Sequence, residues 1–167
     1  MELSERPRIK LTLTTADKVF EILSVLFLVC FWIFTFRNYA VLPEVIPIHF
    51  RANGTADGYG GKWTLFLSTI IATVSYIALT VLSRYPHKFN YTTPITPTNA
   101  LQQYTIMTRM IRVLKLSVIL IFFAIEYKTV QTSLEQGEAL GGWFMFMVMS
   151  LIFVPLFYFL IQLSKNS

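Results

Sequence analysis

Long apolar segments recur along this chain, and they constrain its fold more than any other feature of the sequence. A helix of about 20 residues is about 30 Å long, which matches the hydrocarbon core of a bilayer. The sequence therefore predicts an all-α integral membrane bundle of four transmembrane helices. The four apolar segments are centred on Ile22 to Phe36, Trp63 to Ser83, Val113 to Thr132 and Gly142 to Leu163.

The composition agrees with a membrane protein and leaves little room for a soluble domain. Of the 167 residues, 54% are hydrophobic and 14% are charged, whereas soluble domains average about a quarter charged residues. Four helices with short connections account for the length, so residues 1–167 are predicted to form a single membrane domain. The single cysteine, Cys30, excludes an intrachain disulfide and a cysteine metal cluster.

Local signals place the start of one helix and a distortion in another. Thr14 and Asp17 resemble a capping box, which predicts a helix that starts near Ala16 and continues to about Ala40. Pro155 lies in the middle of the fourth apolar segment, where it removes a backbone hydrogen bond and is expected to kink the helix.

Hydroxyl-bearing residues follow one face of the second apolar segment. Their helical spacing has two interpretations, close packing between helices or a hydrophilic pathway across the membrane. Packing needs no further partner, because a hydroxyl can bond to a backbone carbonyl of its own helix. The residues are Thr69, Thr73, Tyr76 and Thr80.

The distribution of lysine and arginine predicts the orientation in the membrane. Four of the fourteen basic residues precede the first apolar segment, five lie in residues 84–115, and one follows the fourth segment. Cytoplasmic loops carry the excess of basic residues. We therefore expect a multi-pass protein of the cell (inner) membrane, with both termini in the cytoplasm and the loop at residues 42–62 outside.

Residues 84–115 contain five basic residues and no acid. Thr96 and Pro97 form a plausible helix start, and an apolar stripe follows them. Residues 84–112 therefore form either a cytoplasmic basic loop with an amphipathic surface helix or an elongation of the third membrane helix. In both cases uncompensated cations meet anionic lipid headgroups. Nucleic acid is not expected, since topology explains most of the basic residues. The predicted headgroup residues are Arg84, Lys88, Arg109, Arg112 and Lys115.

The loop at residues 42–62 reads LPEVIPIHFRANGTADGYGGK and is more patterned than a simple connection requires. Residues 45–50 are β-branched and aromatic, with prolines that restrict them to an extended edge segment. Asn53 and Gly54 are a strong tight-turn signal. The glycines that follow, including Gly58, indicate close backbone approach or positive φ. We expect this extracytoplasmic loop to be ordered.

This loop resembles a bacterial membrane domain known as domain of unknown function sixteen-forty-eight. The same domain opens the SdpI-type immunity proteins, so the resemblance implies a membrane hairpin and an immunity-like role against a secreted killing factor. The matching residues are Leu42, Pro43, Ile46, Pro47, His49, Phe50, Asn53, Gly54, Asp57, Gly58, Tyr59, Gly60 and Lys62.

The loop also supplies the candidate binding residues. His49 either titrates or binds a ligand, or it organises the loop by bonding to Asp57. Metal binding needs three or four ligands, and only His49, Asp57 and Glu44 are close in sequence. We therefore expect no metal, no cofactor and no catalytic residue, and the chain is not predicted to be an enzyme. The candidate binding residues are His49, Asn53, Gly54, Asp57, Gly58, Tyr59 and Lys62.

Glu126 is predicted to lie within the membrane. It follows Lys115 by eleven residues, about 16 Å of helix, so one of the two charges falls within the apolar layer. Lys115 has a long stem that can extend to water, which leaves Glu126 in the outer half. Glu126 is then a functional site, or it reaches the surface, or it pairs with a cation. The candidate cations are Arg37, Arg51 and Lys62.

Three classes of function remain open from the sequence. The first is a binding, signalling or immunity-like module whose outer loop meets a peptide or a membrane-protein partner. The second is a small-solute or proton-coupled transporter subunit that uses Glu126. The third is an accessory structural subunit of a membrane complex. The sequence leaves the oligomeric state open.

Overall fold

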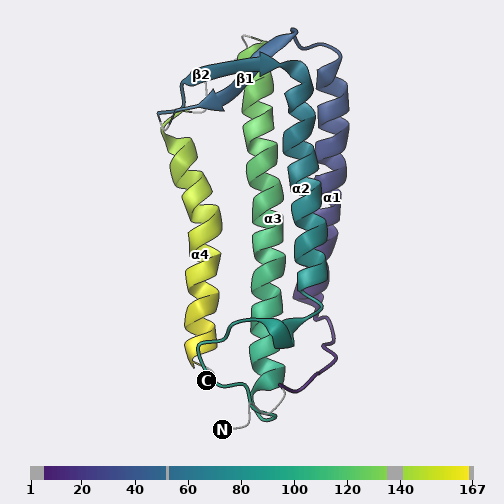
Figure 1. Cartoon of the computed structure of the whole chain (residues 1–167), viewed down its shortest axis with the longest axis vertical. Helices are drawn as coiled ribbons and strands as arrows, with labels where there is room; N and C mark the ends of the chain where they lie inside the picture. Colours follow the sequence, from purple (N-terminus) through teal and green to yellow (C-terminus); the bar gives the residue numbers. More distant parts are fainter. Residues whose placement is uncertain (1–5, 52, 135–140, 166–167) are drawn as a thin grey trace.

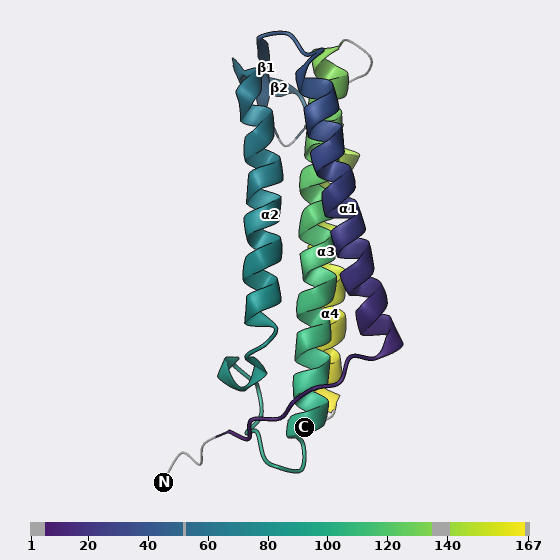
Figure 2. The same cartoon turned by 90° about the vertical axis from the view of Figure 1, so that its right-hand side faces the viewer.

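The computed structural model describes residues 6–51, 53–134 and 141–165, which form a mostly helical chain (Figures 1 and 2). Long helices run side by side, and a β-hairpin covers one end of them. The helices are α1 (Thr15–Tyr39), α2 (Leu65–Leu82), α3 (Ala100–Ser133) and α4 (Trp143–Lys165), the strands are β1 (Val45–Phe50) and β2 (Ala56–Gly61), and short 3-10 turns occupy Lys62–Thr64 and Pro86–Lys88.

Among the described residues, three helical segments are long and apolar enough to cross a membrane: Thr15–Tyr39, Lys62–Leu82 and Trp143–Lys165. They correspond to the first, second and fourth apolar segments of the sequence, and they indicate a membrane protein. The third apolar segment lies inside α3, which is not one of the three. α3 also carries five charged side chains.

α3 is the central helix of the fold. It has 34 residues, about 51 Å of helix, and it packs against α1, α2 and α4. α4 packs mainly against α3, so α3 lies between α4 and the other two helices (Figure 1). The helix is continuous from Ala100 to Ser133, so residues 100–112 of the basic segment lead without a break into the third apolar segment.

The predicted start of α1 is confirmed, whereas that of α3 is wrong. The Thr14 hydroxyl accepts a hydrogen bond from the Asp17 amide, and the Asp17 carboxylate accepts one from the Thr14 amide, which completes a capping box. Asn99, not Thr96, is the N-cap of α3. The amide of Thr96 donates to the Asn99 side chain at 2.9 Å, so this pair organises the turn before the helix.

The loop at residues 42–62 is a β-hairpin, which the expectation of an all-α protein did not include. β1 and β2 pair antiparallel, with irregular register beside His49. The turn contains Gly54 at φ 85°, as the Asn53-Gly54 signal predicted. Gly58 lies in β2 without a positive φ, so that part of the prediction is wrong. The alternative, close approach, holds, because a Cβ atom at Gly58 would lie 3.0 Å from the Cβ of His49.

Two small apolar clusters hold the hairpin and α4 in place. At the hairpin end, Leu42, Ile46, Leu65 and Val130 are buried together, so β1 is anchored to α2 and α3. At the opposite end, α4 is anchored to α3 by a second cluster. Its buried members are Met107, Met110, Phe159 and Leu163.

The first and last described residues lie at the same end of the helices, opposite the hairpin (Figure 1). We call this the terminal end. The extended segment before α1 crosses that end, below α2 and across the first turns of α3 (Figure 2). The two ends of the bundle therefore present different structures, a hairpin at one and the N-terminal segment at the other.

Candidate functional site

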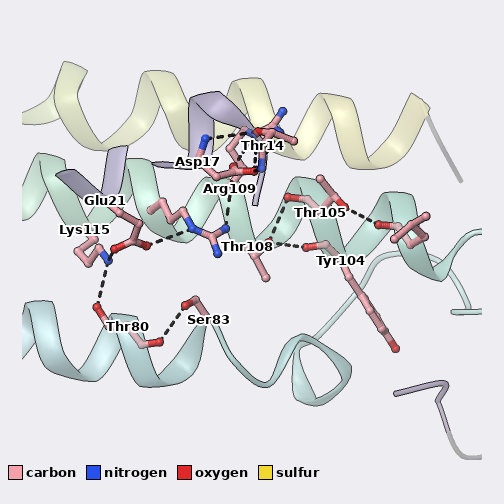
Figure 3. Close-up of polar contacts among 12 residues, drawn as sticks. Thr14, Asp17, Glu21, Thr80, Ser83, Tyr104, Thr105, Thr108, Arg109 and Lys115 are labelled. Carbon is pink, nitrogen blue, oxygen red and sulfur yellow. Dashed lines mark hydrogen bonds and ion pairs between the residues drawn. The ribbon is translucent and has the colours of Figure 1, made fainter. Parts of the chain in front are cut away.

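An ion network joins α1 to α3 near the terminal end (Figure 3). Arg109 donates to Asp17 at 2.9 Å. Arg112 donates to Glu21 at 3.1 Å. Lys115 donates to the other carboxylate oxygen of Glu21 at 2.6 Å. We call these five residues the ion network.

Most of the network is shielded from solvent. The side chain of Lys115 is 1% exposed and that of Asp17 is 3% exposed. Lys115 also donates to Thr80 at 3.0 Å, and its ammonium lies 4.7 Å from the centre of the Tyr76 ring. These partners offset the large desolvation cost of burying an ammonium. Loss of either partner in a buried ion pair leaves a charge that costs several kcal/mol, about 3–5 in measured cases.

The network corrects the prediction of five uncompensated cations. Arg109, Arg112 and Lys115 are paired with the two acids of α1, and Lys115 does not extend to water. Arg84 and Lys88 are exposed at the terminal end. Headgroup contact therefore stays a prediction for those two alone.

Asp17 and Glu21 supply the acids of the ion network, and the sequence analysis did not predict this pairing for either. They are four residues apart, and their basic partners on α3 are spaced by three. Each set therefore lies along one helix face. That complementarity is a usable signal once α1 and α3 are assumed to be neighbours.

Glu126 lies near the hairpin end, buried at 1% exposure among three hydroxyl groups. Thr35 of α1 donates to one carboxylate oxygen at 2.6 Å. Ser68 and Thr69 of α2 donate to the other at 2.5 and 3.0 Å. We call these four residues the carboxylate cluster.

The cation partners predicted for Glu126 do not contact it. Lys62 pairs with Glu44 at 3.0 Å, and Arg51 pairs with Asp57 at 3.1 Å. Within residues 6–51, 53–134 and 141–165, no ion pair involves Glu126. Its carboxyl group is therefore met by hydroxyl groups, and the surface-reaching alternative is wrong as well.

The hydroxyl stripe of α2 packs against its neighbouring helices. Thr69 bonds to Glu126 and to Thr35. Thr73 accepts a hydrogen bond from the Trp32 indole at 3.1 Å, and Thr80 accepts one from Lys115. The packing interpretation accounts for these contacts.

A groove of about 330 Å³ leads to Glu126 from beneath the hairpin. Its walls come from β1, α3 and α2 with the turn before it, and they are mostly apolar, with Thr64, Ser68 and Thr129 as the polar lining residues besides Glu126. We call it the hairpin groove. Ile46, Pro47 and Ile48 line it from β1, Leu67 and Ile71 from α2, and Phe122 and Ile125 from α3.

The two polar clusters are separated by an apolar stretch of α3. Residues 116–125 contain one polar residue, Ser117. Ile119 and Ile121 are buried there, and the Phe31 and Phe123 rings meet edge to face at 5.4 Å. Along α3 itself the two clusters are therefore separated by apolar side chains, whereas Thr69 and Thr80 of α2 contact one cluster each.

The other predicted loop residues form an exposed set on the hairpin. His49 bonds to Asp57 at 2.5 Å, as the loop-organising interpretation predicted, and Arg51 bonds to the same carboxylate. The hydrogen bond from His49, assisted by Arg51, lowers the pKa of Asp57 below its ordinary value. Asn53 caps the turn by accepting from Thr55. None of these side chains lines the hairpin groove.

Lys62 and Tyr59, the last two candidate binding side chains, differ in their exposure to solvent. Lys62 is mostly buried and lies over the Tyr39 ring, so it fastens the end of the hairpin to α1. Tyr59 is 63% exposed. In the part of the chain that the structure describes, no group of three or more His, Cys, Asp or Glu residues is arranged to hold a metal ion.

A comparison with protein families finds a match around the hairpin. Residues 25–73 match the profile of a family described as a domain of unknown function, DUF1648. This match confirms the family resemblance. The matched region runs from α1 through the hairpin into α2 and includes Thr35, Ser68 and Thr69, whereas Glu126 lies outside it. The relation to SdpI-type immunity proteins and a bacterial origin stay predictions.

A relative is similar over most of the length of the chain. An uncharacterized protein of Archaeoglobus fulgidus is 28% identical over 169 residues, which cover 93% of this chain and 91% of the relative. No solved structure matches the chain.

Proposed function

We propose that this protein is a multi-pass membrane protein that binds a ligand in the hairpin groove, with Glu126 as the polar anchor. The observation that carries the proposal is the placement of a buried carboxylate at the base of an apolar groove whose wall is the hairpin strand β1. Binding sites are typically apolar concavities with a few placed polar groups.

The lining defines the chemistry of the ligand. A groove of about 330 Å³ lies within the usual range for small-molecule sites. Aliphatic and aromatic walls fit an apolar body, and the carboxylate fits one cationic or hydrogen-bond-donating group. The ligand is therefore an amphiphile with an ammonium or similar donor head, including an apolar segment of a peptide that carries a lysine.

The membrane topology that accompanies this proposal has four spans, with α3 as the third. Pairing of Arg109, Arg112 and Lys115 with α1 supports it, because paired charges cost less within a membrane. The hairpin faces outside and both termini face the cytoplasm, in agreement with the distribution of basic residues. An immunity-like role, in which the ligand is a secreted peptide, rests on the family resemblance.

Proton-coupled transport is the second candidate, and the buried Glu126 favours it. A transporter needs access to its site from both sides in turn, and the apolar stretch of α3 at residues 116–125, between Glu126 and the ion network, argues against this. Proteoliposomes loaded with a pH-sensitive dye test it directly. Proton flux that disappears in Glu126→Gln would replace the binding proposal with transport.

Photolabelling tests the binding proposal. A photoreactive long-chain alkylamine is added to the protein in lipid nanodiscs, and labelled residues are mapped by mass spectrometry. We expect labels on Ile48, Phe122 and Ile125, and a several-fold loss of labelling in Glu126→Gln. The alcohol of the same chain length should label the groove weakly in both proteins.

A matched variant controls for charge. Glu44→Gln also removes one carboxylate at the hairpin end, but Glu44 is 86% exposed and lies outside the groove. It should leave the labelling unchanged. Labels spread evenly over lipid-facing residues such as Val74 would contradict the proposal.

A further inference from the structure

A second groove, of about 490 Å³, opens at the terminal end and reaches the ion network. The N-terminal segment, α1, the end of α2 and α3 all contribute to its lining. We call it the terminal groove. It is independent of the hairpin groove, which lies at the opposite end of α3.

The terminal groove is strongly basic. Lys10, Arg84 and Arg112 line it, and Glu21 is the acid among its lining residues. Glu21 already accepts from both Arg112 and Lys115. The ion network as a whole holds three cations and two acids, so it has a net positive charge. Arg112 is its basic member that lines the groove.

The same groove is also apolar on one side. Ile9, Leu11 and Leu13 of the N-terminal segment line it, and the hydroxyls of Thr80 and Ser83 lie on the α2 side. A wall with both cations and leucine side chains matches a molecule that has an anionic head and a hydrocarbon part. A free phosphate would use only the cations.

The N-terminal segment is tied down beside the groove. Arg6 donates hydrogen bonds to the backbone carbonyls of His87 and Phe89, and its guanidinium lies 5.6 Å from the centre of the Tyr91 ring. The Tyr91 hydroxyl in turn donates to the carbonyl of Pro86 at 2.9 Å. This attachment anchors the N-terminal segment, which supplies Lys10, to the segment after α2, which supplies Arg84.

We propose that the terminal groove binds the phosphate headgroup of an anionic membrane lipid. Lys10 of the N-terminal segment and Arg84 of the segment after α2 contact the phosphate, and Arg112 of α3 adds positive charge to the same lining. The hydrocarbon part of the lipid lies along Leu11 and Leu13. Of the two residues for which headgroup contact stays a prediction, this proposal includes Arg84 and leaves out Lys88, which does not line the groove.

Native mass spectrometry of the delipidated full-length protein in detergent tests this inference. The probe is dioleoyl phosphatidylglycerol, and dioleoyl phosphatidylcholine is the zwitterionic comparison. Each headgroup contact from a basic residue is worth about fivefold in affinity near a membrane surface. We therefore expect Arg84→Gln and Lys10→Gln each to weaken phosphatidylglycerol binding about fivefold. Arg112 is left unchanged, because it also carries the ion network.

Lys88→Gln is the matched control. Lys88 is an exposed cation at the same end, its ammonium lies over the Tyr85 ring, and it does not line the groove. It should bind phosphatidylglycerol as the parent does. Equal weakening in Lys88→Gln would replace the groove site with general surface attraction and overturn the proposal.

Competition with inorganic phosphate and thermal unfolding of the variants complete the test. Inorganic phosphate added in excess should not displace the lipid, and displacement would identify a free-anion site instead. Thermal unfolding of Arg84→Gln and Lys10→Gln should match the parent, because both side chains are exposed. Equal binding of phosphatidylglycerol and phosphatidylcholine would also overturn the proposal.

Discussion

The ammonium of Lys115 lies 2.6 Å from the carboxylate of Glu21, and the two residues are 94 positions apart in the sequence. Lys115 is buried at the α1–α3 contact, and Thr80 of α2 also accepts from it. One side chain thus links three helices near the terminal end.

Lys115→Met should destabilise the protein by about 3–5 kcal/mol, because the carboxylate of Glu21 and the hydroxyl of Thr80 lose the ammonium group that donates to them. Chemical unfolding in detergent measures the difference. Arg84→Gln, an exposed cation nearby, should change stability by less than about 0.5 kcal/mol. In Lys115→Met combined with Glu21→Gln, the costs should be less than additive. A Lys115→Met protein as stable as the parent would show that the network adds nothing.

Glu126→Leu should be tolerated within about 1 kcal/mol, although Glu126 is as buried as Lys115. Each of its hydroxyl partners can donate to a second acceptor. Thr35 can donate to the carbonyl of Phe31, and Ser68 can donate to the carbonyl of Leu65. Thr69 can donate to the hydroxyl of Thr35. Removal of the carboxylate therefore leaves no donor unpaired and ends the cost of burying a charge. Thermal unfolding checks this. A loss as large as that of Lys115→Met would make Glu126 a structural residue.

Features encoded by neighbouring residues were predictable from the sequence. The capping box of α1 depends on Thr14 and Asp17 alone, and the tight turn depends on Asn53 and Gly54. In each case the physical cause acts within one element of structure.

The partners of the charged residues were not predictable, because they depend on which helices become neighbours. Arg109 meets Asp17 across 92 positions, and Glu126 meets Thr35 across 91. From the positions of the charges along the sequence, we expected the cations of residues 84–115 to contact lipid headgroups and Glu126 to pair with a cation. Tertiary packing gave the cations acids from α1 and gave Glu126 hydroxyls instead.

Gly54→Ala should destabilise the hairpin by about 1–3 kcal/mol. Gly54 has φ 85°, and an added Cβ would lie 2.2 Å from the amide nitrogen of Gly141. Gly142→Ala is the control, since nothing lies within 4 Å of a Cβ there. Protease susceptibility of the hairpin measures the effect. Equal susceptibility of both variants would show that the turn does not require glycine.

The carboxyl of Asp57 should titrate below its ordinary pKa of 3.8, because His49 and Arg51 stabilise its charged form. A lowered pKa in the folded state stabilises the fold above pH 3.8, and this contribution is lost as the pH falls through the folded value. A carboxyl NMR titration checks the shift. His49→Gln should move the pKa back toward 3.8, and an unchanged titration would contradict the contact.

Single cysteines at Thr55 and Thr92, in a Cys30→Ala background, should react differently with an impermeant thiol reagent on intact cells. Both positions are exposed, so access depends on the side of the membrane. Thr55→Cys should be labelled and Thr92→Cys should be labelled only after the cells are opened. The reverse pattern would invert the proposed orientation.

The uninterrupted course of α3 has a mechanical consequence. The helix contains neither glycine nor proline, so its backbone ladder is stiff from Ala100 to Ser133. Glu126 near one end and Lys115 nearer the other are fixed to the same rod. An occupant of the hairpin groove that twisted this rod would therefore apply a torque to the ion contacts with α1 through the helix backbone alone.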